Sequence, residues 1–311
     1  MEGNLLYSGI DGGGSAWNWY NIARDLSRVN AKNEEVTDRD GHVFGYLCNV
    51  TLEGTGPSVL SVVAASNSWK MRNAVRKTHF LREHMFSEAG VTKSEKGKYG
   101  QTIRMHLQTN MVDPAGYKEA QFFFPQGSIA STAFNVGEWT YSRLASSPSF
   151  DVRDITQNMT LPLVDTYDIA ICGKNIETTE PTLAKTFDTI GMIHSYNLDR
   201  MEQVPDATDD TKLINPNNPF AMLRSQSVTG GEIVDIASDQ ELEEPPYDVA
   251  DDGHSIYPLL KQVTQVNATE STRKFQIFLP AGLMAIYSTN SMAASLLNVE
   301  VVAKVLCKDM A

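Results

Sequence analysis

The chain has 311 residues, of which 41% are hydrophobic and 21% are charged, a composition typical of a soluble globular protein with a large core. No apolar run approaches the roughly 18 residues that cross a bilayer, and the first residues lack the basic start and apolar core of a secretory signal. The formal net charge is −12, and the segment Asp199 to Asp252 holds 14 acidic and 3 basic residues, a net of −11. Because no Arg- or Lys-rich tail offsets this charge, we expect no strong direct nucleic-acid binding.

Three consecutive glycines, Gly12 to Gly14, follow Ile10 and Asp11 near the start of the chain. The stretch resembles the first phosphate motif of the sugar-kinase and actin ATPase superfamily, which would imply an ATP-dependent enzyme. The lysine of a P-loop and the glycine spacing of a dinucleotide-binding turn are both missing. The kinase-like motif also needs a strand directly after the glycines, whereas SAWNWYNIARDLSRVN favours a helix or a loop, with a helix over Trp17–Val29. We therefore predict a pliable N-terminal arm over residues 1–40 and keep the sugar-kinase-like enzyme as an alternative.

Two predicted strands, Val43–Leu52 and Ser58–Ala65, precede the one clear helix, Trp69–Ala89. Ser68 can cap the start of this helix, Gly90 can end it, and apolar residues repeat at helical spacing along one face. The other face is basic and carries Lys70, Arg72, Arg76, Lys77 and Arg82. A basic helix face is usually solvated, but this one also suits charge pairing with the acidic segment of a neighbouring copy.

The remaining patterned segments alternate apolar and polar residues with period two, as half-buried strands do. The clearest are residues 102–109, 273–280 and 297–308, and in the first of them Arg104 and His106 fall on the polar face. Further strands are predicted over Gln121–Phe124, Gly137–Leu144, Asp165–Cys172, Thr189–Asn197, Phe220–Ser227 and Glu232–Ala237. Short strands separated by Pro- and Gly-bearing turns predict an all-β sandwich or barrel rather than alternating βαβ units.

The residue types that carry catalysis or bind metals form no recognised motif in this chain. Cys48, Cys172 and Cys307 lie far apart, which predicts reduced, buried thiols. His79 and His84 are five residues apart and miss the i,i+4 spacing of a metal-binding pair. The acidic runs lack the alternating oxygen ligands of an EF-hand calcium loop. We therefore predict no catalytic residue, no cofactor and no metal site.

The sequence of elements resembles viral jelly-roll capsid proteins, with many antiparallel strands, long Pro- and Gly-bearing loops and one helix after the early strands. FQIFLPAGLMAIYS and LLNVEVVAKVLCKDM look like the last two strands of such a barrel, and GEWTYSRLA and EEPPYDVADDGHSIYP are similar to stretches of capsid proteins. The Ser- and Pro-punctuated stretch Ala145–Thr160 lies near mid-chain and suits a domain seam. The resemblance therefore implies two tandem antiparallel jelly-roll barrels, residues 41–150 with the helix inserted and residues 151–311. A single jelly roll, which usually needs fewer residues, is the alternative.

The same resemblance implies a structural major capsid protein, with the double jelly-roll lineage favoured, from a small DNA virus or an internal-membrane phage. It implies self-assembly as homotrimeric capsomers into an icosahedral shell, with minor capsid or penton proteins and an internal membrane as further partners. The protein is then expected in the virion, and in the host cell cytoplasm during assembly. A β-rich spike, fibre or carbohydrate-binding module is a further alternative. As interface residues we predict two tryptophans and three basic helix residues, namely Trp17, Trp19, Arg72, Arg76 and Lys77.

Overall fold

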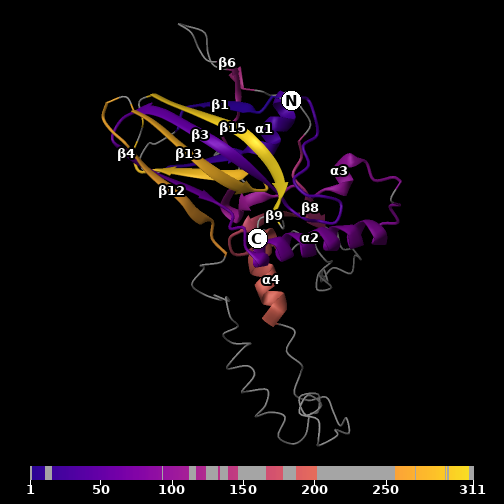
Figure 1. The fold of residues 1–311 in the computed structure, drawn as a ribbon. Coiled ribbons are helices and arrows are strands. Elements are labelled where there is room, and N and C mark those ends of the chain that lie inside the picture. Colours follow the sequence, from indigo (N-terminus) through magenta and orange to yellow (C-terminus); the bar gives the residue numbers. More distant parts are fainter. Residues whose placement is uncertain are drawn as a thin grey trace, which may run out of the picture. The chain divides into compact units, whose positions relative to one another are not determined.

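The protein is mostly β, as predicted, and its sheets are largely antiparallel (Figure 1). The computed structural model describes residues 2–10, 16–92, 94–111, 117–123, 132–133, 139–145, 166–177, 187–201, 256–269, 271–290, 292 and 294–307. The chain forms two compact units, Met1–His194 with Ile256–Ala311, and Ser195–Ser255. Of the second unit only residues 195–201 are described, so the fold below is that of the first.

Eight antiparallel strands build two four-stranded sheets, which we call the β-sandwich. One sheet has the order β1-β15-β3-β13, formed by Asn4–Ser8, Ala294–Leu306, Phe44–Thr55 and Ser271–Pro280. The other has the order β12-β4-β14-β2, formed by Leu259–Val266, Ser58–Ala64, Leu283–Ser288 and Ala16–Asn21. Counted along the chain, the first of these strands pairs with the eighth, the second with the seventh, the third with the sixth and the fourth with the fifth. N-terminal (indigo to purple) and C-terminal (orange to yellow) strands therefore alternate within each sheet (Figure 1).

The period-two patterns explain how the two sheets bury one face each. In β3 the side chains of Tyr46, Cys48, Val50 and Leu52 are buried and alternate with less buried neighbours. In β15 the predicted alternation holds at its start, where Leu297 and Val299 are buried. The pairing of β15 with β3 then shifts register between Val301 and Ala303, and Val302 is exposed. At and beyond this irregularity Val301, Ala303 and Val305 remain less exposed than Val302 and Lys304, and Cys307 is buried, so the stripe predicted up to residue 307 is confirmed.

The predicted long helix is confirmed as α2, Trp69–Glu88. The Ser68 side chain accepts a hydrogen bond from the Met71 N–H at 3.2 Å, and Gly90 adopts a φ of +72° just beyond the helix end. The predicted helix Trp17–Val29 is wrong in its first half, because residues 16–21 form β2 and α1 covers Ile22–Val29. No helix in the described part of the chain is long and apolar enough to cross a membrane.

The long connection between β4 and β12 carries a third, mixed sheet. Its order is β10-β11-β9-β5, with β8 also paired to β9; the strands are Ile176–Glu177, Phe187–Gly191, Thr166–Cys172, His106–Gln108 and Arg143–Ala145. β9 runs parallel to both β11 and β5, which the sequence patterns did not predict. The same connection holds α2, α3 (Lys98–Gln101), a 3₁₀ turn (Thr109–Met111), the β6–β7 pair (Gln121–Phe123, Thr132–Ala133) and the start of α4 (Met192–Met201). A strand was predicted over Thr189–Asn197, but the chain enters α4 at Met192.

The observed strand pairing differs from the predicted division into an arm (1–40) and two barrels (41–150 and 151–311). β1 and β2 lie within the predicted arm, and both sheets of the β-sandwich combine strands from either side of the predicted seam. Alternation along one strand says which face is buried but not which distant strand becomes its neighbour. Most of the seam, residues 11–15 with the three glycines, and the strands predicted over Phe220–Ser227 and Glu232–Ala237 lie outside the described residues.

All three cysteines are free and buried, as predicted. Burial raises the pKa of each thiol to about 12, so almost no thiolate is present at neutral pH. We expect the native protein to react very slowly with a disulfide-based thiol reagent at pH 8, and the denatured protein to react at three thiols. Rapid labelling of any one thiol in the native state would contradict this burial.

Candidate functional site

A pocket of about 780 Å³ opens where α1 of the β-sandwich meets β5, β8 and β9 of the third sheet. Its volume lies within the range of small-molecule sites. The wall consists of three arginines, two carboxylates, four aromatic or imidazole rings and one threonine: Arg24, Arg28, Arg143, Glu119, Asp168, His106, Tyr117, Trp139, Tyr141 and Thr140. These residues come from five separated stretches of sequence, so only the tertiary structure brings them together.

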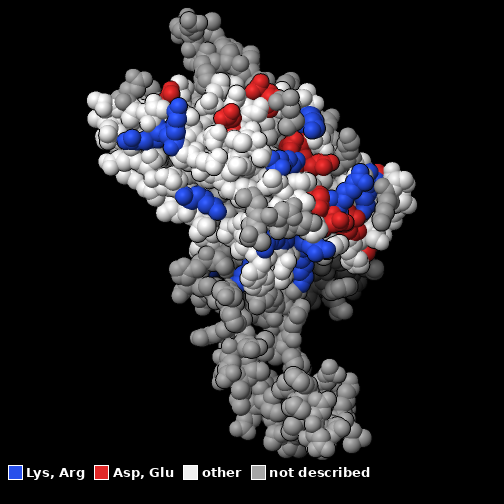
Figure 2. Space-filling model, in the orientation of Figure 1, with Lys and Arg blue, Asp and Glu red and all other residues white. Residues whose placement is uncertain are grey.

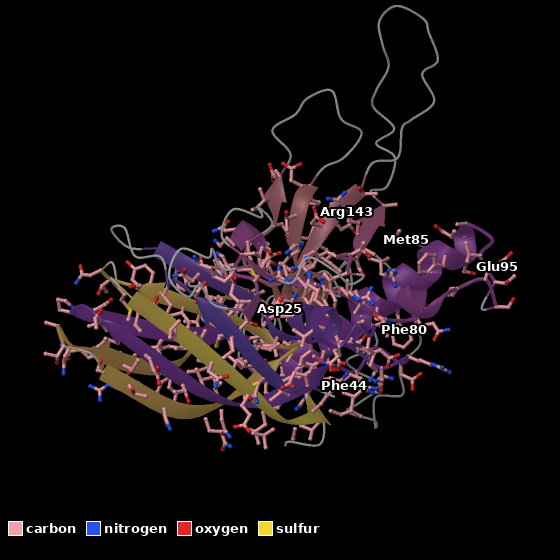
Figure 3. The ribbon with its side chains drawn as sticks, turned by 90° about the horizontal axis from the view of Figure 1, so that it is seen from above. Asp25, Phe44, Phe80, Met85, Glu95 and Arg143 are labelled. Carbon is pink, nitrogen blue, oxygen red and sulfur yellow. The ribbon has the colours of Figure 1, made fainter. Side chains whose placement is uncertain are left out.

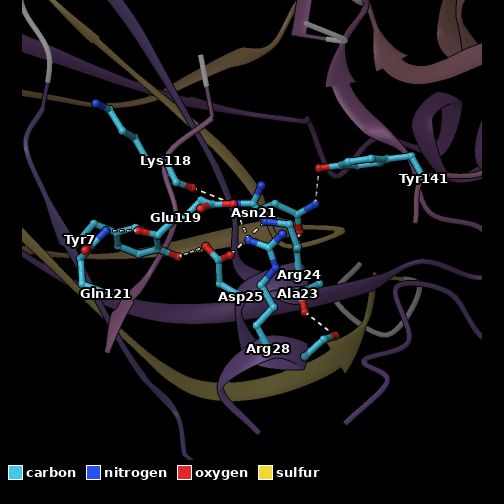
Figure 4. Close-up of polar contacts among 11 residues, drawn as sticks. Tyr7, Asn21, Ala23, Arg24, Asp25, Arg28, Lys118, Glu119, Gln121 and Tyr141 are labelled. Atoms are coloured by element: carbon cyan, nitrogen blue, oxygen red, sulfur yellow. Dashed lines mark hydrogen bonds and ion pairs between the residues drawn. The ribbon is translucent and has the colours of Figure 1, made fainter. Parts of the chain in front are cut away.

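Arg24, which lines the pocket, belongs to a buried ion pair with Asp25 (Figure 4). Asn21 caps α1 by accepting the Arg24 backbone N–H, and the Arg24 Nε donates to Asp25 Oδ1 at 2.9 Å. Arg24 also donates to the Lys118 carbonyl at 2.6 Å, and the Tyr7 hydroxyl donates to Asp25 Oδ2 at 2.8 Å. Burial alone disfavours the charged guanidinium, but the adjacent Asp25 carboxylate outweighs it and raises the Arg24 pKa. The network therefore joins β1, α1 and the inserted segment through one charged pair.

The aromatic wall of the pocket is centred on His106 and Tyr141. Their rings stack with centroids 3.8 Å apart at 19°, and the Tyr117 hydroxyl lies 2.8 Å from His106 Nδ1. Asn21 donates to the Tyr141 hydroxyl at 3.1 Å, and Trp139 meets the Tyr141 ring edge-on. Burial lowers the pKa of His106 to about 4, so its imidazole is neutral at pH 7. The wall thus offers uncharged rings with polar atoms at their rims.

The other charges of the pocket are also paired. Arg28 contacts Glu119 at 2.5 Å, and Arg143 Nε contacts Asp168 Oδ1 at 2.9 Å. The Arg143 side chain is 62% exposed, whereas that of Asp168 is 14% exposed, so this pair lies at the mouth. Two N–H donors in the wall, Arg28 Nε and Trp139 Nε1, are buried and have no hydrogen-bond partner among the described residues. The charged side chains of the pocket therefore nearly cancel, while these two N–H donors still lack an acceptor among the described residues.

The sequence did not predict this pocket. The alternation over residues 102–109 placed His106 on a polar, solvent-facing side, but His106 and Arg104 are both buried, as are the apolar residues between and beside them. The strand is covered on both faces, because the Trp139 to Arg143 stretch packs against its polar face. The sequence held one signal for this pocket: the strand predicted over residues 102–109 has a polar face, and the aromatic stretch WTY, which could cover it, follows later in the chain.

The predicted interface residues fall on two surfaces. Trp17 and Trp19 stack at 5.5 Å on β2, where Trp17 is 44% exposed and Trp19 is buried. On α2, Arg76 and Lys77 are exposed, and Arg76 lies over the ring of Phe80, 5.6 Å from its centroid. Arg72 instead donates to the Cys307 carbonyl at 3.3 Å and so ties α2 to the end of β15. Figure 3 shows Phe80 and Met85 on α2 and Asp25 inside the packed strands.

Apolar side chains are exposed on the same two elements and on one sheet edge. β12 pairs with β4 alone among the described strands, and its Leu259, Leu260 and Val263 are exposed; we call them the β12 patch. On α2 the exposed apolar residues are Trp69, Phe80 and Leu81, which with Arg76 and Lys77 we call the α2 patch. Figure 2 shows few charged side chains over the β-sandwich in this view, and both signs mixed over the α2 and α3 side.

One group of possible metal ligands occurs in the described part of the chain. Carboxylate and imidazole atoms of Asp38, Asp40 and His42 lie within 4.8 Å of one another. The backbone N–H groups of Asp40 and His42 both donate to Asp38 Oδ1, and His42 Nδ1 lies 3.0 Å from Asp38 Oδ2. These contacts make the group a hydrogen-bonded turn and account for its closeness.

Comparison with protein-family models, with curated proteins and with solved structures found no match. The function of this chain must therefore be inferred from the pairing of its strands and from its exposed and concave surfaces.

Proposed function

We propose that this protein is a structural subunit that self-assembles into an icosahedral virus shell and that its β-sandwich is a single jelly roll. The observation that carries the proposal is the nested strand pairing, first with eighth and third with sixth in one sheet, second with seventh and fourth with fifth in the other. This order arises when one long antiparallel hairpin is rolled into two sheets, which is the double Greek key of the jelly roll. Viral capsid proteins are prominent users of that architecture.

In this proposal a single jelly roll takes the place of the two tandem barrels that the resemblance implied. The eight strands draw on residues 4–64 and 259–306, and the third sheet and α2 lie in the connection between the fourth and fifth of them. The extra length of the chain is then one long insertion in a single roll. Insertions of this kind leave the core pairing intact and supply surface for contacts with other copies.

Two surfaces suit contacts between copies. The β12 patch lies on a sheet edge, where the unpaired backbone groups and apolar side chains of a strand promote association with another chain. The α2 patch combines apolar and basic side chains, and the segment 199–252 of another copy carries the opposite charge. A homotrimer that tiles a shell would bury the first by hydrophobic contact and the second by charge pairing.

The substitution Leu260→Lys tests whether copies of the protein associate through the β12 patch. Leu260 is 53% exposed, so the substitution should leave the monomer stable while placing a charge in the contact. We expect light scattering and electron microscopy to show oligomers or shells for the unaltered protein and a shift to monomer for Leu260→Lys. Gln265→Lys, which adds the same charge to an exposed polar position of β12, is the matched control and should still assemble.

The two contacts respond differently to salt. Raising the salt from about 0.1 M to about 1 M shortens the Debye length from about 10 Å to about 3 Å, which weakens pairing through Arg76 and Lys77 but leaves apolar contacts in place. A protein that stays monomeric at every concentration and salt would overturn the proposal.

The enzyme alternative gains no support from the strand pairing. A phosphate loop at Gly12–Gly14 needs β1 and β2 to form one hairpin, whereas β1 pairs with β15 and β2 with β14. A rise in Tm with ATP that Asp11→Ala abolishes would revive this alternative.

A further inference from the structure

We propose that the pocket between α1 and the β5–β8–β9 strands binds a pyranose ring of a glycan. This is a binding activity separate from self-assembly, because the residues that line the pocket belong to neither the β12 patch nor the α2 patch. Three features of the wall carry the proposal: its unpartnered donors, its balanced charge and its aromatic rings.

The unpartnered donors call for a ligand rich in oxygen. Arg28 Nε and Trp139 Nε1 are buried in the pocket wall without a partner among the described residues. A buried donor left unsatisfied costs about 1–3 kcal/mol, and a ligand oxygen relieves this cost once the Arg28 or Trp139 side chain turns its N–H toward the cavity. The carboxylates of Glu119 and Asp168 each contact an arginine through one oxygen, which leaves acceptor positions on the other. Hydroxyl groups of a sugar both donate and accept, and so match a wall that presents both kinds of atom.

The balance of charge disfavours phosphate-bearing ligands. The three arginines of the wall are matched by three carboxylates: Arg24 with Asp25, Arg28 with Glu119 and Arg143 with Asp168. Nucleotides and nucleic acids bind where positive charge is in excess, because their phosphates must be neutralised. A neutral, hydroxyl-rich ligand meets no such requirement, and the charged pairs can serve it as fixed hydrogen-bonding groups.

The rings supply the remaining contact. A pyranose has an apolar face of C–H groups, and tryptophan and tyrosine provide a large apolar area beside a polar tip. Trp139 and Tyr141 stand edge-to-face at 6.1 Å in the wall, and the stack of His106 on Tyr141 holds the tyrosine ring in place. Asn21 donates to the Tyr141 hydroxyl, and the Tyr117 hydroxyl contacts His106 Nδ1. These contacts hold both rings in place, so the wall is preformed.

The test is binding of methyl pyranosides to the full chain by calorimetry and by saturation-transfer NMR. Neutral hexosides and an N-acetylhexosaminide form the sugar arms, and AMP and inorganic phosphate form the anion arms. We expect at least one sugar to bind and neither anion to compete with it. Tighter binding of AMP or phosphate than of every sugar would overturn the proposal, as would the absence of binding in all sugar arms.

Substitutions locate the binding site. Arg28→Lys keeps the charge opposite Glu119 but removes the Nε donor, and we expect it to weaken sugar binding about tenfold. Trp139→Ala should weaken it by at least that factor, whereas Trp69→Ala, which removes an exposed tryptophan from α2, should leave affinity unchanged. Unfolding curves for each variant check the fold. Equal affinity of Trp139→Ala and the unaltered protein, with both folded, would place the sugar elsewhere and overturn the proposal.

Discussion

Replacing Arg24 with methionine is expected to lower the free energy of unfolding by about 3–5 kcal/mol, because it leaves the fully buried Asp25 carboxyl group without its charge partner. The Arg24 guanidinium and the Tyr7 hydroxyl both donate to the Asp25 carboxylate, and in the variant only the Tyr7 hydroxyl would remain. Urea denaturation followed by tryptophan fluorescence measures the change. The effect should spread beyond α1, since the same guanidinium also holds the Lys118 carbonyl of the inserted segment.

Two further variants distinguish whether Arg24→Met destabilises the protein by removing the charge partner of Asp25 or by disturbing the packing. The double variant Arg24→Met with Asp25→Leu removes both charges and should recover most of the stability, because an apolar pair of similar volume often replaces a buried ion pair without loss. Arg143→Met breaks the exposed pair with Asp168 and should cost less than about 1 kcal/mol. If the double variant is less stable than Arg24→Met alone, the burial of Asp25 is not the source of the loss.

Acidification should destabilise the protein through His106. Burial lowers its pKa in the folded state to about 4, whereas an unfolded histidine titrates near 6.5. Between these values the unfolded chain binds a proton that the folded chain does not, so stability falls as the pH drops from about 6.5 to about 4. The full difference amounts to about 3 kcal/mol. The charged groups facing His106 are Asp168, which favours protonation, and Arg143, which opposes it.

The measurement compares the pH dependence of the unaltered protein with that of His106→Gln, which cannot titrate. Loss of the stack on Tyr141 lowers the stability of the variant at every pH, so the informative quantity is the change in unfolding free energy between pH 7 and pH 4.5. We expect that change to be smaller in His106→Gln. Equal changes in both proteins would mean that the pKa of His106 is not lowered in the folded state.

The pocket and the β-sandwich depend on one another through the first three elements of the chain. β1 contributes Tyr7, the end of β2 contributes Asn21 as helix cap and as donor to Tyr141, and α1 contributes the buried ion pair. A ligand in the pocket would therefore stabilise the N-terminal strands in their sheets. By linkage, sugar binding should raise the Tm of the whole β-sandwich.

Local sequence patterns were sufficient where one segment alone decides the structure. Ser68 and Gly90 bracket α2 because capping and a left-handed turn involve only neighbouring residues. The alternation in residues 273–280 predicted β13, because the burial of one strand face repeats every second residue. β2 was mistaken for helix because its inward-facing positions include Asn18, a polar residue that is fully buried.

The sequence by itself determined that the protein is mostly β, where α2 begins and ends, and that the three thiols are buried. The tertiary structure alone decided which strands pair, where β15 carries its bulge, and that His106 faces Tyr141 instead of solvent. The physical reason is the range of the interactions. Capping and alternation act over a few residues. Sheet order and the pocket wall arise instead from contacts between residues that lie in separate segments of the chain, such as β1 with β15 and His106 with Tyr141, and no local pattern records these contacts.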